Sequence, residues 1–551
     1  METEIAPHLT AVPQKKETPS FDVGTVSIPA GLGVVEDFHN ADPNRTVIHI
    51  QDAHCNYNAQ HKIAELIGYL SKEYGINSIN LEGGKGQYDL SVFQGIPDRK
   101  VREKVADQFV REGLVNGAEY FAVCGPGRIK LWGVENARLY FKNLDVYRNS
   151  LEYKEEADKY LETLNRRLNG LKRHIFSDEL IKFDRIYEGY KSGEIDIKDY
   201  LRYLTEKADS EGINVKAFPN MYLLCLSLEA EEKIDFKRAD VERDLLIGCL
   251  HEILAEVELK ELVTETVKFS RKLISPERFY AYLIKKAGSI NLDMGTVPEF
   301  RKYIAYVSTY GAVDKSALMR EIDALETGIK GTLYGNEKQK ELDILSKNLT
   351  LTRSLFNVTL TKYDYEYYKK HRASFAVSKY VSFIAREAPV YRITPDVDED
   401  IDKLDRYRDE MSGFYEISFK RDQAFLKNIR FPKVNSRATI LVTGGFHTEN
   451  LLRLFREEGI SYVSIIPEFE NEKGYRSPYF ELLGTGRSPL LEAVSAGMSG
   501  IAIQSMLSEM KVPGGDKELF RRAKEVLEAL EKGWEITLDT ANGSVTFSRG
   551  K

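Results

Sequence analysis

The sequence lacks the signatures of several common protein classes. Its 551 residues include only four cysteines, which lie far apart with no C-x-x-C pair: Cys55, Cys124, Cys225 and Cys249. Such spacing argues against a zinc knuckle or a disulfide framework. The glycine patterns of phosphate loops and dinucleotide-binding turns are missing as well, so we expect no nucleotide cofactor. No serine or cysteine stands in a G-x-S-x-G elbow, which excludes that form of nucleophilic hydrolase.

Charge and hydropathy exclude further classes. Charged residues make up 30% of the chain and the net charge is −7, so we expect no broad basic surface and no nucleic-acid partner. The longest apolar stretch, 490–507, is interrupted by Glu492, Ser495 and Gln504, which predicts a buried helix and no membrane span. The first 20 residues are polar and lack the apolar core of a secretory signal, which favours a cytoplasmic protein.

What the sequence does contain is an α/β pattern. The β-branched run Thr46–Gln51 predicts a buried strand, and Tyr57–Tyr74 has apolar residues at i, i+3, i+4 and i+7, as expected for an amphipathic helix. Ile76–Glu82 is strand-like again. Strand, helix and strand within so short a stretch predict a βαβ unit, whose strands are parallel.

The same pattern recurs after a long helical stretch. Further strands are predicted at 129–135, 388–393, 438–443 and 460–466, with helices at 98–112, 420–429 and 448–458. We therefore predict an α/β fold, with a mixed, mainly parallel sheet and flanking helices, split by a large all-α insertion. The predicted parts are an N-terminal extension (1–45), a first core half (46–138), the helical insertion (139–387), a second core half (388–470) and a tail with helices and a hairpin at Asn542-Gly543 (471–551).

Two places in the sequence share one design. Gln51-Asp-Ala-His54 and Gly444-Gly-Phe-His447 each place a histidine just after a β-branched strand and before an amphipathic helix. Ligands of open parallel sheets bind beyond the carboxyl ends of the strands. Glu82 and Glu135 follow their own strands in the same way. We therefore expect His54, Glu82 and His447 to form a site, with Glu135 nearby.

Histidine and carboxylate together suit two kinds of chemistry. A neutral imidazole can take a proton from water while a carboxylate fixes its tautomer. Alternatively, His54, Glu82, His447 and Asp52 could hold a divalent metal such as Zn, Mn or Fe that activates water. Further candidates are the late-helix pair Arg421 and Asp422, in which Arg421 could stabilise an oxyanion, and Glu119, which could equally be a helix-start charge.

These residues carry a family resemblance. Gln51-Asp-Ala-His54, with Asn56 and Gln60 behind it, then Glu82, Arg421-Asp422 and Gly444-Gly-Phe-His447, resemble the superfamily of erythromycin esterases, ChaN-like proteins and TraB/Tiki proteins. The resemblance covers the two core halves only. Gln51 stands where the first glycine is usual, and Asp52 where ChaN-like and esterase members carry glutamate.

The resemblance implies a hydrolase acting on an ester, lactone or peptide bond of a small-molecule or peptide substrate. His54, Glu82 and His447 would form its site, assisted by Arg421. Members differ in activity, because the esterases use a histidine base, the Tiki type is metal-dependent and ChaN-like proteins bind haem. A non-catalytic protein that binds haem or another small ligand is therefore the alternative.

Overall fold

The computed structural model describes most of the chain. It covers residues 23–470, apart from 30, 55, 89, 91–96, 112, 114, 127–128, 271–275 and 433–437, together with 534–539 and 544–549. The helix predicted within 490–507, the turn at Asn542-Gly543 and Cys55 lie outside these residues. Among the helices of the described part, none is long and apolar enough to cross a membrane.

A seven-stranded mixed sheet forms the base of the fold. Its strands are β1 (Gly33–His39), β2 (Asp42–Asp52), β3 (Ser78–Leu81), β4 (Lys85–Gln87), β5 (Lys130–Val134), β6 (Ala438–Gly444) and β7 (Ile460–Pro467). They lie in the order β1-β7-β2-β6-β3-β5-β4. The five inner strands are parallel, and β1 and β4 pair antiparallel at the two edges. The α/β class is thus confirmed. Strand β6 pairs with both β2 and β3, although more than half of the chain separates β6 from these two strands in sequence.

Three details differ from the sequence predictions. Strand β1 falls within the segment predicted as an N-terminal extension, and β4 was not predicted at all. The strand predicted at 388–393 is wrong, because Ala388–Tyr391 forms a 3₁₀ helix that directly follows the 11-residue helix Val377–Glu387. Pro389 lacks the N–H that a strand ladder needs, and Arg392 has a left-handed φ of 58°.

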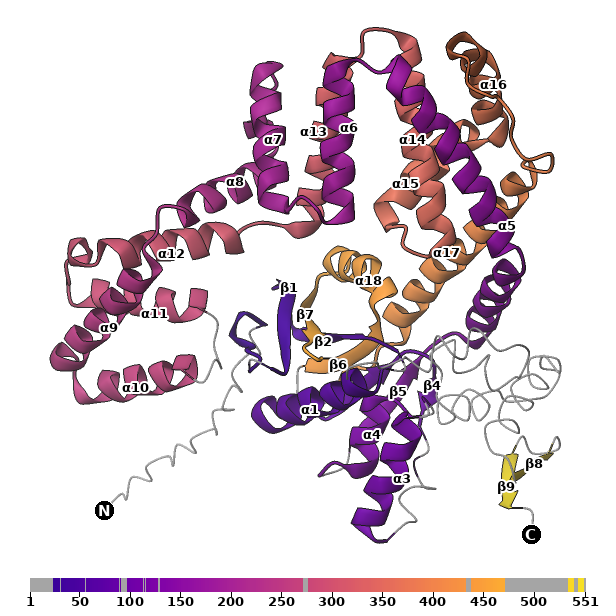
Figure 1. Cartoon of the computed structure of the whole chain (residues 1–551). Helices are drawn as coiled ribbons and strands as arrows, with labels where there is room; N and C mark the ends of the chain where they lie inside the picture. The colour runs from indigo at the N-terminus through magenta and orange to yellow at the C-terminus, as the bar shows by residue number, and fades with distance from the viewer. Residues whose placement is uncertain are drawn as a thin grey trace, which may run out of the picture.

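Alternating side chains send the two faces of the sheet into separate cores. Ile48, Ile440 and Val463 face the helices α1 (Tyr57–Tyr74), α3 (Arg99–Arg111) and α4 (Gly117–Cys124). Their neighbours in sequence, Leu441 and Tyr462 among them, face the helices α17 (Lys403–Asn428) and α18 (Gly445–Glu457) on the other side. Figure 1 shows these two helix layers below and above the sheet.

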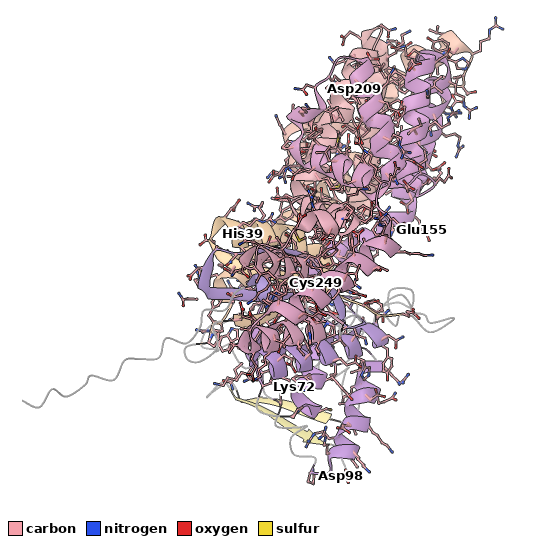
Figure 2. The ribbon with its side chains drawn as sticks, turned by 90° about the vertical axis from the view of Figure 1, so that its left-hand side faces the viewer. His39, Lys72, Asp98, Glu155, Asp209 and Cys249 are labelled. Atoms are coloured by element: carbon pink, nitrogen blue, oxygen red, sulfur yellow. The ribbon has the colours of Figure 1, made fainter. Side chains whose placement is uncertain are left out.

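Between β5 and β6 the described chain is helical. A 39-residue helix, α5 (Ala137–Ile175), leaves the sheet and packs along α17. The helices that follow are α6 (Asp178–Ser192), α7 (Ile197–Ser210), α8 (Pro219–Glu231), α9 (Phe236–Ile253), α10 (Glu256–Ser270), α11 (Pro276–Ser289), α12 (Pro298–Gly311), α13 (Lys315–Leu333), α14 (Glu337–Phe356), α15 (Lys362–His371) and α16 (Val377–Glu387). They carry the molecule far from the sheet, so Asp209 on α7 and Asp98 before α3 lie at opposite ends (Figure 2). The predicted hairpin is present as β8 (Trp534–Asp539) and β9 (Ser544–Arg549).

The helices α6–α13 contain a duplication that the sequence analysis missed. We call α6–α9 the first repeat and α10–α13 the second. Their corresponding elements begin 79 positions apart, at Ile197 and Pro276 for α7 and α11 and at Phe236 and Lys315 for α9 and α13. Contacts repeat at the same offset, since Lys207–Glu179 and Lys286–Glu258 are equivalent ion pairs.

The two repeats exchange their last helices. Helix α13 packs into the core of α6, α7 and α8, and α9 packs into the core of α10, α11 and α12. The Glu242 carboxylate on α9 accepts from the N–H groups of Glu299 and Phe300, the latter at 2.9 Å, at the start of α12. Its counterpart Glu321 on α13 accepts from Asn220 and Met221, at 2.8 and 3.0 Å, at the start of α8. Each carboxylate thereby satisfies N–H groups that have no partner within their own helix.

Candidate active site

The predicted residues meet at the carboxyl edge of the parallel strands. Asp52 ends β2, and Gly444 pairs with it as the last residue of β6. Glu82 follows β3, Glu135 follows β5, and His447 lies in the first turn of α18. The strand-end rule thus places groups from four strands side by side, as the sequence predicted.

His54 forms the first of two aspartate–histidine pairs. Its Nδ1 lies 2.6 Å from Oδ2 of Asp52. The second oxygen of Asp52 accepts from Gln60 at 2.6 Å, and Gln60 in turn accepts from the Gly117 N–H at 2.7 Å, which fixes the carboxylate between α1 and α4. Because Nδ1 is bound to the carboxylate, Nε2 is left as the reactive nitrogen of His54.

His447 forms the second pair, and this one is buried. Its Nδ1 is hydrogen-bonded to Oδ1 of Asp422 on α17. The other oxygen of Asp422 accepts from Asn450 at 2.6 Å. The His447 side chain is 5% exposed, against 28% for His54, so only the first pair is open to solvent.

Glu82 connects His447, Arg421 and the end of β6. Its Oε1 lies 3.2 Å from Nε2 of His447 and accepts from Arg421 at 2.8 Å. Its Oε2 accepts from the Gly444 N–H at 2.8 Å. A Cβ at Gly444 would lie 2.6 Å from Nε2 of His54, so the glycine makes room for that ring. Glu82 is therefore held rigidly on three sides.

Arg421 is a buried member of this network, not a surface residue. It is 6% exposed. Its guanidinium donates to both oxygens of Glu135, at 3.2 and 2.8 Å, and to Asn143 on α5 at 3.1 Å. All three of its nitrogens therefore have partners within the protein, and Arg421 positions carboxylates instead of facing a substrate.

Mutual charge interactions shift the pKa values of these groups. Burial lowers the pKa of His54, but Asp52 outweighs burial and raises it from 6.5 to about 9. Burial likewise lowers the pKa of His447, while Glu82 and Asp422 raise it to about 10. Burial raises the pKa of Glu82, yet His447 and Arg421 hold it well below its usual 4.5. Both histidines are therefore protonated near neutral pH in this arrangement.

Three other predicted candidates have structural partners. Gln51 donates to Glu36 of β1, and Asn56 caps α1 by accepting from the Ala59 N–H at 3.0 Å. Glu119 is fully buried and accepts from the Asn116 N–H at 2.9 Å, which completes a capping box at the start of α4. The helix-start interpretation of Glu119 is the one that this geometry supports.

Sequence reasoning overlooked two residues beneath the site. Asn143 joins Arg421 to the backbone of α17 by donating to the Phe414 carbonyl at 2.8 Å. His49 is fully buried within β2 between Thr443 and Ser464, and burial lowers its pKa to about 3. His49 could have been noticed from the sequence, because it is a polar residue inside a β-branched strand. No sequence pattern pointed to Asn143.

The donor set does not form a metal site in this conformation. No group of three or more His, Cys, Asp or Glu side chains in the described part of the chain is arranged to hold a metal ion. The reason is visible at Glu82, whose two oxygens are bound by Arg421, His447 and the Gly444 N–H.

Comparison with protein-family models, curated proteins and solved structures finds no match for this chain.

Proposed function

We propose that the protein is a hydrolase of ester, lactone or peptide bonds in which His54 is the general base. The observation that carries this proposal is the partly exposed Asp52–His54 pair beside a buried, charged cluster. Asp52 fixes the ring, so that Nε2 is the nitrogen that accepts a proton once His54 is neutral, which its raised pKa of about 9 places in the alkaline range. The resemblance to the erythromycin esterase superfamily, which rests on the same residues, supports the same class.

The chemistry assigns a different role to each residue. Neutral His54 takes a proton from water, the hydroxide adds to the substrate carbonyl, and the tetrahedral intermediate expels the alcohol or amine with the proton from His54. His447 stays protonated because both of its ring nitrogens are bound to carboxylates, those of Glu82 and Asp422, so its role is to orient Glu82 and not to contact the substrate. Arg421 also holds Glu82 in place.

The helical stretch 139–387 belongs to this proposal as an insertion that covers the site and selects the substrate. One contact supports it directly. The Lys362 N–H at the start of α15 donates to Glu449 at 3.1 Å, and Glu449 lies on α18, two residues from His447. The helical stretch thereby contacts the element that carries part of the site.

A panel of p-nitrophenyl esters, lactones and peptides tests the proposal. We expect turnover with at least one class, and its loss in His54→Ala with little change in melting temperature. A matched control exists, because His61 on α1 also pairs with an aspartate, Asp107 on α3, at 2.8 Å. His61→Ala should keep full activity. Equal losses in both variants would contradict the assignment.

Two further measurements separate the remaining hypotheses. Stoichiometric Zn, Mn or Fe in the purified protein, lost in His447→Ala, would replace the metal-free route with a metal-dependent one. A Soret band on haem titration, absent in His54→Ala and accompanied by no turnover, would favour the haem-binding alternative.

A further inference from the structure

A cavity in the helical region lies apart from the candidate active site. It has a volume of about 630 Å³ and is lined mainly by α6, α13 and α14. This volume is within the range of small-molecule sites. No residue of the β2, β3, β5 and β6 strand ends contributes to its lining.

The charges that line the cavity are unequal. Four lysines each pair with one acid: Lys172 with Asp184, Lys330 with Asp343, Lys347 with Asp323 and Lys340 with Glu337. Six acids line the cavity, so two are left over, and they are Glu188 and Glu326. The lining therefore has an excess of negative charge.

Glu326 is the buried member of these two. It is 9% exposed, and its Oε1 accepts from the Tyr200 hydroxyl at 2.6 Å. No lysine or arginine nitrogen of the described chain lies within 4.0 Å of its carboxylate. Burial accordingly raises the pKa of Glu326. Lys330 and Lys191 act on this carboxylate through longer-range charge but form no ion pair with it, and the one hydrogen bond seen to it within the described protein is that of Tyr200.

The duplication provides an internal comparison for this residue. The counterparts of Tyr200 and Glu326, 79 positions away from each, are Phe279 on α11 and Ile247 on α9, which pack in the apolar core of α9 to α12. The surrounding geometry is the same, because Tyr190 stacks on Tyr200 as Phe269 stacks on Phe279, both at 4.3 Å between ring centres. The helical packing therefore does not require a tyrosine–glutamate pair, and another role must account for it.

We propose that this cavity binds a small organic dication, a primary diamine or polyamine, with one ammonium group on Glu326. The ammonium supplies the close ion pair that this carboxylate does not form within the described protein and the charge that the four lysines leave unbalanced. Glu188, which is exposed on α6, provides the second negative charge of the lining for the other ammonium group. This site is independent of the hydrolase proposal.

Calorimetric titration of the full-length protein with 1,4-diaminobutane tests the proposal. We expect saturable binding, no binding of the uncharged 1,4-butanediol, and affinity at least about 30-fold weaker in Glu326→Gln, since removing one partner of a buried charge pair has effects of this size. His54→Ala should bind the diamine normally, which separates this test from that of the hydrolase.

A second variant guards against misfolding. Tyr200→Phe combined with Glu326→Ile copies the apolar pair Phe279 and Ile247 of the equivalent core, so it should fold with an unchanged or higher melting temperature and bind no diamine. Absence of diamine binding to the wild-type protein up to about 1 mM, or undiminished binding in either variant, overturns the proposal.

Discussion

The substitution Gly444→Ala tests the site at its tightest point. A Cβ there would lie 2.6 Å from Nε2 of His54, whereas ordinary contacts begin at 3.4 Å, so the ring must move by about 0.8 Å. The hydrogen bond of 2.6 Å to Asp52 opposes that movement. The backbone itself tolerates alanine, because Gly444 has φ −58° and ψ 147°.

We therefore expect a loss of function without a loss of fold. A misplacement of about 1 Å costs roughly 100-fold in rate, so kcat/KM should fall by about that factor, while the melting temperature stays nearly unchanged. Hydrolysis of the best substrate from the panel measures the first, and thermal unfolding the second. NMR titration of His54 adds a readout that needs no substrate, because its pKa should fall from about 9 towards 6.5 as the Asp52 contact lengthens.

The neighbouring glycine supplies the control. A Cβ at Gly445 would meet only Oε1 of Gln51, at 3.7 Å, which is an ordinary contact. Gly445→Ala should therefore keep wild-type activity. If Gly444→Ala retained activity within about twofold, far less than the 100-fold that misplacement predicts, the reasoning about His54 would be refuted.

Three further predictions concern charge and helix capping. Since the pKa of His54 is raised to about 9, activity that needs its neutral form should rise with pH up to about 9, and a rate maximum below pH 7 in the pH–rate profile would contradict a His54 base. The pKa of His447 is raised from 6.5 to about 10, so its contribution to stability is complete below pH 6.5 and declines up to pH 10, by at most about 1.4 kcal/mol per pH unit. Urea unfolding across this range should show that decline, and Asp422→Asn should weaken it. Glu242→Ala and Glu321→Ala should each destabilise the protein by about 1–3 kcal/mol in urea unfolding, because each leaves two helix-start N–H groups without an acceptor; a change in only one variant would argue against equivalent repeats.

The strand-end residues were predictable because the rule that finds them is local. A β-branched run followed by a turn places His54, Glu82, Glu135 and His447 at one edge, whatever the rest of the chain does. The environment of Arg421 was not predictable in this way. Its partners Glu82 and Glu135 lie 339 and 286 positions away in sequence, so no local pattern indicated that they bind all of its donors and leave none for an oxyanion.

The errors in the fold have equally physical causes. The edge strands β1 and β4 were missed because β1 has exposed and polar positions and β4 has only three residues, so neither shows a clear apolar period. At 388–393 the apolar composition outweighed Pro389 in the prediction. The duplication was missed because most equivalent positions keep only the apolar pattern, as Met221 and Phe300 do.

The exchange of last helices has a consequence for a shorter chain that contains only one of the two repeats. A chain ending after α9 would have α6, α7 and α8 without the helix that closes their core, and an α9 with nothing to cover it. Two such chains could satisfy each other by a reciprocal swap, with Glu242 of each capping the α8 of the other. In such a swap a single repeat would be half of an intertwined dimer, and the duplicated chain has the arrangement of that dimer within one polypeptide.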